Sequence, residues 1–233
     1  MIIYILVLYI GLVVKYMKNY KYLLFDVDGT IIESGPGVEN SYQYALDTLG
    51  YNVKVNRKDI IGPPIKQSMM EIYGLSEEDD QKGLELYRER YDSIGKKDET
   101  FLYDGIENVL KRCKENGYIV ATATSKPEYF TTFILENLGV SQYIDFIGAA
   151  TLDKSRSNKE QVIEYVIESL NIKDKSQVLL IGDTKFDLIG AETIGIDALA
   201  VLYGYGTEEE IKAYKSVYIA RNMKELEDYL CQE

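Results

Sequence analysis

The stretch YLLFDVDGTIIES, residues 22–34, places Asp26 and Asp28 at the end of an apolar run and follows them at once with Gly-Thr. Asp and Gly are both common turn residues, so the stretch alone also fits a buried strand that ends in a solvated turn. A carboxylate pair that takes part in chemistry needs a cation and further polar groups around it. The rest of the chain must therefore distinguish a turn from a catalytic site.

The composition bounds the class of protein. A length of 233 residues with 46% hydrophobic content is enough for one α/β domain of ordinary size and a small insertion. The net charge of -12, without a block of basic residues, argues against a nucleic-acid partner or an anionic membrane surface. An anionic substrate would need a local positive site, which a metal ion supplies. The chain has no histidine, which excludes imidazole-dependent catalysis and imidazole metal ligands.

Two features bear on location. Cys113 and Cys231 form no metal-binding or disulfide framework, so we expect a reducing, cytoplasmic environment. Residues 1–16 form an apolar extension that is short of the roughly 20 residues of a spanning helix and lacks the pattern of a secretory signal. Either the domain begins at Met17 and translation starts there, or the extension is a short membrane-associated anchor or an extra packed segment. Membrane association is expected only if residues 1–16 are translated as part of the protein.

Short apolar runs alternate with amphipathic stretches along most of the chain. The runs are KYLLFDVD (21–28), YIVATAT (118–124), FIGAA (146–150), QVLLIGD (177–183) and DALAVLY (197–203). The stretches between them have apolar residues at helical spacing; they are residues 105–117, 126–140 and 157–172. This alternation predicts an α/β fold with a Rossmann-like, doubly wound parallel sheet.

The strand pattern disappears between Val38 and Thr100. Apolar residues there recur at helical spacing, as in Tyr42, Ala45, Leu46 and Leu49, with a break at GPP, residues 62–64. We therefore expect a helical cap at residues 38–100, inserted into an α/β core made of residues 17–37 and 101–233. The chain should cross between them near SGPG (34–37) and LYDG (102–105).

Polar residues follow the apolar runs. They are Asp26, Asp28 and Thr30 after the first run, Thr124 and Ser125 after the second, and Asp183 and Asp187 after the fourth. Ligands of open α/β sheets bind beyond the carboxyl ends of the strands, so these side chains should converge. Four carboxylates in one place repel one another unless a cation neutralises them. Oxygen-only ligands indicate Mg²⁺.

The sequence from about Lys21 onward resembles the haloacid dehalogenase superfamily of phosphohydrolases, and within it the phosphoglycolate phosphatase-like branch with a helical cap. Four motifs in the family's order carry the resemblance: DVDGT (26–30), TATSKP (122–127), SRSNKEQVI (155–163) and IGDTKFDLIGAETIGI (181–196). The third motif is also similar to that of relatives described as 5′-nucleotidases. An isolated Asp-x-Asp would support this resemblance only weakly, whereas four motifs in the family's order support it strongly.

The resemblance implies roles for the first two motifs. Asp26 would be the nucleophile that forms an aspartyl-phosphate, and Asp28 the general acid and then base, with its backbone carbonyl on the metal. Thr124 would donate a hydrogen bond to the phosphate, although Thr122 or Ser125 could make that contact instead. Thr30 and Ser125 are further candidates for binding the substrate.

The other two motifs would supply charge and metal ligands. Lys159 would neutralise the phosphoryl group and Asp26. The motif departs from the commoner Lys-Pro form, so a solvated basic loop with Lys154 and Arg156 is the alternative.

The resemblance gives the metal site as Asp26, Asp28, Asp183 and Asp187. Asp183 would bind Mg²⁺ directly. Asp187 would hold a metal-bound water or orient Lys159, and it also suits a helix N-terminus.

The function implied is a Mg²⁺-dependent phosphatase that hydrolyses small phosphomonoesters of the phosphoglycolate or nucleoside 5′-monophosphate type. A hexose phosphomutase and a non-catalytic phosphate-binding regulatory module are the alternatives, while Asp28 argues against a dehalogenase. The segment IIGPPIKQSM, residues 60–69, resembles the substrate-facing part of the cap and offers Lys66 and Gln67 as substrate contacts. The expected partner is a small phosphorylated metabolite, and the sequence does not indicate an oligomeric state.

Overall fold

The structure is a computed structural model that describes residues 20–60 and 68–231. Its main sheet has six strands in the order β5-β4-β1-β6-β7-β8, and every neighbouring pair is parallel. The strands are β1 (Tyr22–Phe25), β4 (Ile119–Pro127), β5 (Phe146–Ala150), β6 (Val178–Gly182), β7 (Asp197–Val201) and β8 (Tyr218–Ala220). The first five of these are the five predicted runs, so the predicted α/β fold with a parallel sheet is confirmed.

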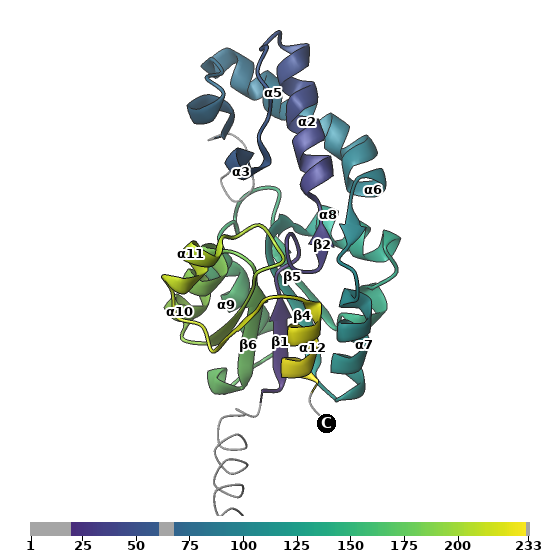
Figure 1. The fold of residues 1–233 in the computed structure, drawn as a ribbon, viewed down its shortest axis with the longest axis vertical. Coiled ribbons are helices and arrows are strands. Elements are labelled where there is room, and N and C mark those ends of the chain that lie inside the picture. The colour runs from purple at the N-terminus through teal and green to yellow at the C-terminus, as the bar shows by residue number, and fades with distance from the viewer. Residues whose placement is uncertain (1–19, 61–67, 232–233) are drawn as a thin grey trace, which may run out of the picture.

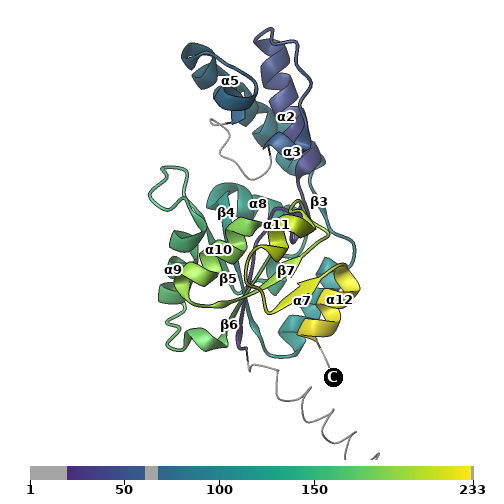
Figure 2. The ribbon, with the colours of Figure 1, turned by 60° about the vertical axis from the view of Figure 1, so that its left-hand side comes forward.

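Helices cover both faces of this sheet (Figures 1 and 2). They are α7 (Ile106–Glu115), α8 (Glu128–Asn137), η3 (Ser141–Tyr143), α9 (Lys159–Ser169), η4 (Lys175–Gln177), α10 (Lys185–Ile194), α11 (Glu208–Lys212) and α12 (Met223–Leu230). One core joins α7, α8 and α12 to the sheet, and the second joins α9, α10 and α11 to its other face. Within β1, Leu23 and Phe25 belong to the first core and Leu24 to the second, as the alternation of side chains along a strand requires.

A helical insertion, residues 35–98, lies between two short strands, β2 (Ile32–Glu33) and β3 (Phe101–Leu102), which pair antiparallel. Its described helices are α2 (Gly35–Thr48), α3 (Arg57–Ile60), η1 (Ser68–Ile72), α5 (Glu77–Arg90), η2 (Tyr91–Gly95) and α6 (Lys96–Asp98). All of these except α6 contribute to a separate core that includes Tyr42, Leu46 and Met69. Figure 1 shows the insertion beyond the carboxyl end of β1.

Several features differ from the sequence prediction or fall outside what the structure describes. The strands β2, β3 and β8 were not predicted, because runs of two or three residues carry too little periodicity. Helix α2 begins at Gly35, within the SGPG segment that we expected to precede the cap. The predicted extension at residues 1–16 and the GPP break lie outside the described residues. Within the two described ranges, no helix has the length and apolar character needed to cross a membrane.

Candidate functional site

Asp26 lies directly beyond β1, at the carboxyl edge of the sheet. The residues before it, Leu23 to Phe25, are fully buried, and the Asp26 amide extends the ladder by donating to the Ile181 carbonyl at 2.8 Å. The chain then turns, because the amides of Ile31 and Ile32 both donate to the Val27 carbonyl at 2.9 Å. An apolar strand that ends in this turn holds a carboxylate at the sheet edge with only 8% of the residue exposed.

Lys159 brings a positive charge to Asp26. Its Nζ lies 2.9 Å from Oδ1 of Asp26 and 2.7 Å from Oδ1 of Asp187, and it donates to the Ala123 carbonyl at 2.8 Å. The residue is the first of α9, whose start is fixed by a capping box between Asn158 and Gln161. Lys159 is 5% exposed, so these acceptors replace water around the ammonium.

The charges in this buried cluster shift one another's pKa values. Burial raises the pKa of Asp26 to about 6, with the Lys159 ammonium opposing the rise and the Asp187 carboxylate adding to it. Burial would lower the pKa of Lys159, but the carboxylates of Asp187 and Asp26 outweigh it and the pKa is raised. Lys159 is therefore a fixed cation, and a further positive charge beside Asp26 would favour the ionised form of that carboxyl.

Asp187 has a local role as well as its contact with Lys159. Its Oδ2 accepts hydrogen bonds from the Thr184 amide at 3.0 Å and the Thr184 hydroxyl at 2.9 Å, which completes the N-terminal cap of α10. Its Oδ1 meets Lys159. Both oxygens of this fully buried carboxylate are therefore engaged, and Asp187 fixes the position of Lys159 relative to α10.

Asp183 follows β6 and is also fully buried. Its Oδ1 accepts from the Thr30 hydroxyl at 3.2 Å and its Oδ2 from the Tyr205 amide at 2.7 Å. Burial raises its pKa well above the usual range, and the nearby carboxylates of Asp187 and Asp26 add to the rise. A Cβ atom on Gly29, which has φ +82°, would lie 2.1 Å from Asp183 Oδ2, so only glycine lets the first turn approach this carboxylate.

Asp26, Asp183 and Asp187 each offer a carboxylate oxygen within 4.8 Å of the others. Three buried carboxylates with one lysine among them retain excess negative charge, which a divalent cation would neutralise. The donor atoms are all oxygens, the type that Mg²⁺ prefers. The residues present therefore fit a hard divalent cation.

Asp28 lies in a different environment from Asp26. Its carboxylate accepts hydrogen bonds from the Ser34 hydroxyl and from the Lys126 ammonium, which lies 3.1 Å from Oδ1 and 3.2 Å from Oδ2. The Lys126 ammonium also donates to the Tyr91 hydroxyl at 2.7 Å. The Asp28 carboxylate is not one of the three that form the acidic cluster. The two aspartates of the first motif thus face different cations.

The second strand end separates its three hydroxyl residues. Thr122 donates to the Gly148 carbonyl at 2.9 Å within the sheet. Thr124 is buried, and its hydroxyl interacts with Asp26 and lowers the pKa of that carboxyl against the larger effect of burial. Ser125 is exposed and lies in a bulge of β4 between Thr124 and Pro127. The structure therefore brings Thr124 to Asp26, whereas the hydroxyl of Thr122 is engaged elsewhere.

The other basic residues of the third motif lie away from this cluster. Lys154 is exposed in a loop, with φ 63°. The Arg156 guanidinium donates to the Ala149 carbonyl at 2.6 Å and packs over the ring of Tyr165, 3.6 Å from its centroid. Of these three cations, Lys159 is the one whose ammonium reaches Asp26.

Sequence reasoning missed some residues at this site and named others that the structure does not describe. Lys126 and Tyr205 contact Asp28 and Asp183. Lys126 stands inside the quoted TATSKP motif and could have been singled out as the cation next to the strand end, whereas Tyr205 carries no sequence signal. Lys66 and Gln67, the predicted substrate contacts, lie outside the described residues.

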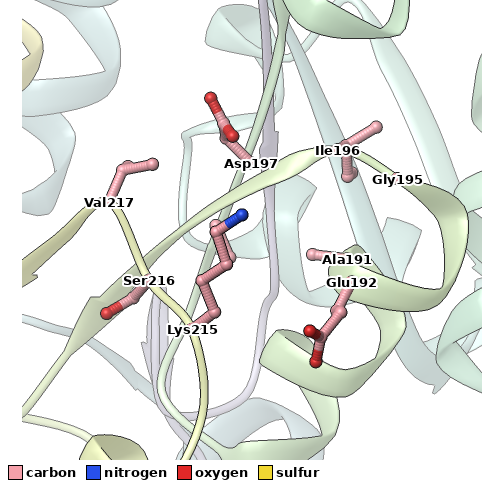
Figure 3. Close-up of a pocket in the computed structure, with 9 residues that line it drawn as sticks. Ala191, Glu192, Gly195, Ile196, Asp197, Lys215, Ser216 and Val217 are labelled. Carbon is pink, nitrogen blue, oxygen red and sulfur yellow. The ribbon is translucent and has the colours of Figure 1, made fainter. Parts of the chain in front are cut away.

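A separate pocket lies at the start of β7 (Figure 3). Its lining includes Glu192, Asp197 and Lys215. Asp197 begins β7, whereas Asp26 and Asp183 follow the carboxyl ends of parallel strands, so the pocket belongs to the opposite edge of the sheet. The Asp197 carboxylate is already bound by the Tyr20 hydroxyl at 2.6 Å. None of the candidate site residues lines this pocket.

Comparison with known proteins gives consistent results. The family described as haloacid dehalogenase-like hydrolase matches residues 23–201. A 5′-nucleotidase from Pseudomonas aeruginosa is 32% identical over 214 residues, which cover 91% of this chain and 96% of the relative. A phosphoglycolate phosphatase from Vibrio parahaemolyticus is 29% identical over 220 residues, 90% of this chain and 95% of the relative.

A solved structure and a further relative are also similar to this chain. A crystal structure described as a predicted phosphatase from Clostridium acetobutylicum has 37% identity and a TM-score of 0.82, covering 92% of this chain and 99% of that chain. A relative from Mycobacterium tuberculosis that is 31% identical over 191 residues, 81% of this chain and 64% of the relative, is named a tyrosine-protein kinase. The chain belongs to the haloacid dehalogenase-like hydrolase family, as the ordered motifs predicted.

Proposed function

We propose that this protein is a Mg²⁺-dependent phosphatase that hydrolyses small phosphate monoesters through an aspartyl-phosphate on Asp26. One observation carries the proposal. A carboxylate at the carboxyl edge of the sheet pairs at 2.9 Å with a buried lysine inside a cluster of three acidic residues. The relatives named 5′-nucleotidase and phosphoglycolate phosphatase support phosphomonoester chemistry.

In the first half-reaction, an Asp26 oxygen attacks phosphorus and the bond from phosphorus to the leaving oxygen breaks. The leaving oxygen takes a proton from Asp28. Lys159 and the Thr124 hydroxyl stabilise the charge on the phosphoryl oxygens. In the second half-reaction, water attacks phosphorus and gives a proton to Asp28. The bond from phosphorus to the Asp26 oxygen breaks, which regenerates the Asp26 carboxylate and releases inorganic phosphate.

Asp26, Asp183 and the backbone carbonyl of Asp28 would hold Mg²⁺, with Asp187 acting through a metal-bound water or through Lys159. The ion when bound supplies positive charge that neutralises both the acidic cluster and the phosphate. Because Lys159 already contacts Oδ1 of Asp187, the geometry favours the second of these roles for Asp187. Thr30 acts indirectly, since its hydroxyl donates to Asp183.

Residues 38–100 would act as a cap that closes over the site and selects the substrate, with Lys66 and Gln67 as contacts to its non-phosphate part. The position of the insertion beyond the carboxyl end of β1 supports this proposal (Figure 1). Closure would exclude bulk water from the reacting groups. The substrates proposed are phosphoglycolate or nucleoside 5′-monophosphates.

A substrate screen tests the function. The purified chain is incubated with nucleoside 5′-monophosphates, phosphoglycolate and sugar phosphates, with Mg²⁺ or with EDTA, and inorganic phosphate is measured. We expect Mg²⁺-dependent release without a bisphosphate activator. Strict dependence on a hexose bisphosphate would favour a phosphomutase, and binding without turnover would favour a regulatory module.

A further inference from the structure

The proposed chemistry assigns no role to Lys126, a cation at this site. The Lys126 side chain is 7% exposed, yet its ammonium does not meet Asp26 or Asp183. It donates instead to both oxygens of Asp28, at 3.1 and 3.2 Å, and to the Tyr91 hydroxyl at 2.7 Å. Lys126 is placed there by the bulge in β4 between Thr124 and Pro127, since a bulge changes the direction of side chains along a strand.

Tyr91 belongs to the helical insertion, in η2, rather than to the α/β core. Its ring stacks on Tyr87 of the insertion at 5.8 Å between centroids and meets Phe130 of the core edge-on at 5.5 Å. The Lys126 ammonium also lies 4.9 Å from the centroid of the Tyr91 ring. Tyr91 therefore links the insertion to the core through a hydrogen bond and a cation–π contact to Lys126 and through ring packing against Phe130.

We propose that Lys126 and Tyr91 are positioning residues that hold the Asp28 carboxylate for proton abstraction from the attacking water. An ionised carboxylate only accepts hydrogen bonds, and the donors around Asp28 are the Lys126 ammonium and the Ser34 hydroxyl. These bonds restrict rotation of the Asp28 side chain, so its oxygens keep one orientation while the water gives up its proton in the second half-reaction. Because Tyr91 comes from the insertion, the arrangement is complete only when the insertion lies against the core.

This inference rests on the proposed phosphatase function and makes a kinetic prediction that is specific to one step. The value of kcat/KM reports the reaction through release of the leaving group, whereas kcat also includes attack of water on the aspartyl-phosphate. With an aryl phosphate, whose leaving group departs without needing a proton, weakening the Lys126–Tyr91 pair should slow only the second step. The phosphoenzyme should then accumulate, and kcat and KM should fall together.

The test compares Tyr91→Phe and Lys126→Met with Tyr129→Phe and Lys96→Met. The control pair is matched, because the Lys96 ammonium donates to the Tyr129 hydroxyl at 3.2 Å and also links the insertion to the core. That pair does not contact Asp28. For each full-length variant, kcat, KM and the acid-quenched fraction of phosphorylated Asp26 are measured with an aryl phosphate and Mg²⁺.

We expect Tyr91→Phe and Lys126→Met to lower kcat by about tenfold or more, to change kcat/KM by less than about threefold, and to raise the phosphorylated fraction. The control pair should match the wild type. Equal losses in kcat and kcat/KM without phosphoenzyme, or the same change in the controls, would overturn the inference. Tyr91→Phe keeps the ring, so it remains informative if Lys126→Met fails to fold. A wild type without Mg²⁺-dependent phosphate release would instead refute the proposed function, and this inference with it.

Discussion

Lys159 Nζ lies 2.9 Å from Asp26 Oδ1, so the first residue of α9 supplies the cation for the aspartate that follows β1. The same ammonium contacts Asp187 at 2.7 Å. One lysine thus offsets two of the three carboxylates in the cluster. Among the described residues, the donors to the third carboxylate, Asp183, are the neutral Thr30 hydroxyl and Tyr205 amide. Substitution of Lys159 and of Asp183 therefore tests the roles of the lysine and of the proposed metal ion separately.

Lys159→Ala should abolish most activity, whereas Lys154→Ala should leave it near that of the wild type. The loss should be about 100-fold or more in kcat, because a fixed charge at the phosphoryl group is removed. Leaving Asp26 and Asp187 without their cation should also lower the free energy of unfolding by about 3 kcal/mol. Phosphate release and chemical denaturation measure the two effects. If Lys154→Ala abolished activity and Lys159→Ala did not, Lys154 rather than Lys159 would be the lysine that meets the phosphoryl group.

Asp183→Asn should have opposite effects on stability and on metal binding. Without metal, removing one of three buried like charges should raise the free energy of unfolding by about 1 kcal/mol. An asparagine can still accept one of the two hydrogen bonds that Asp183 receives. The increase in Tm that Mg²⁺ causes in the wild type should disappear in this variant. Thermal unfolding in EDTA and in Mg²⁺ measures both, and an unchanged response to Mg²⁺ would exclude Asp183 as a ligand.

The stability of the insertion should depend on pH through Glu99. The Arg90 guanidinium binds both oxygens of Glu99, at 2.8 and 2.9 Å, and this hydrogen bonding lowers the pKa of Glu99 from its usual 4.5. A lowered folded pKa gives stability that is present above pH 4.5 and is lost as the pH falls through the folded value. Glu99→Gln should therefore cost about 1–2 kcal/mol at pH 7 and less near pH 3.

The exposed pair of Lys111 and Glu115, 3.9 Å apart, provides the control for this experiment. Glu115→Gln should change the free energy of unfolding by less than about 0.5 kcal/mol at either pH. Denaturant titrations of both variants and the wild type give the comparison. A Glu99→Gln cost that grows towards acid pH would contradict the assignment of the ion pair.

Replacing Lys66 and Gln67 together with alanine should change the ranking of natural substrates. If these residues contact the non-phosphate part of the substrate, a small aryl phosphate should be affected much less than phosphoglycolate or a nucleotide. The measurement is kcat/KM for each substrate. An equal loss for all substrates would show that the pair does not confer selectivity.

The fold could be predicted from the sequence because β1 and β6 are apolar strands, and each is followed directly by an aspartate. Strand ends fix which residues converge, which is why Asp26 and Asp183 could be placed at one edge before the structure was known. The contacts of Asp28 could not be predicted. They depend on a bulge that turns Lys126 and on a tyrosine from the insertion, and both are tertiary effects without a periodic signal. Chain order likewise gives no indication that Tyr205 reaches Asp183.

The central claim is covalent chemistry on Asp26, and acid-quench peptide mapping tests it most directly. The protein is mixed with an aryl phosphate and Mg²⁺, quenched in acid during turnover, digested and analysed by mass spectrometry. We predict that the peptide carrying Asp26 gains the mass of one phosphoryl group, and that Asp26→Asn shows neither this adduct nor phosphate release. A phosphoryl group on another residue, or release that persists in Asp26→Asn, would contradict the account.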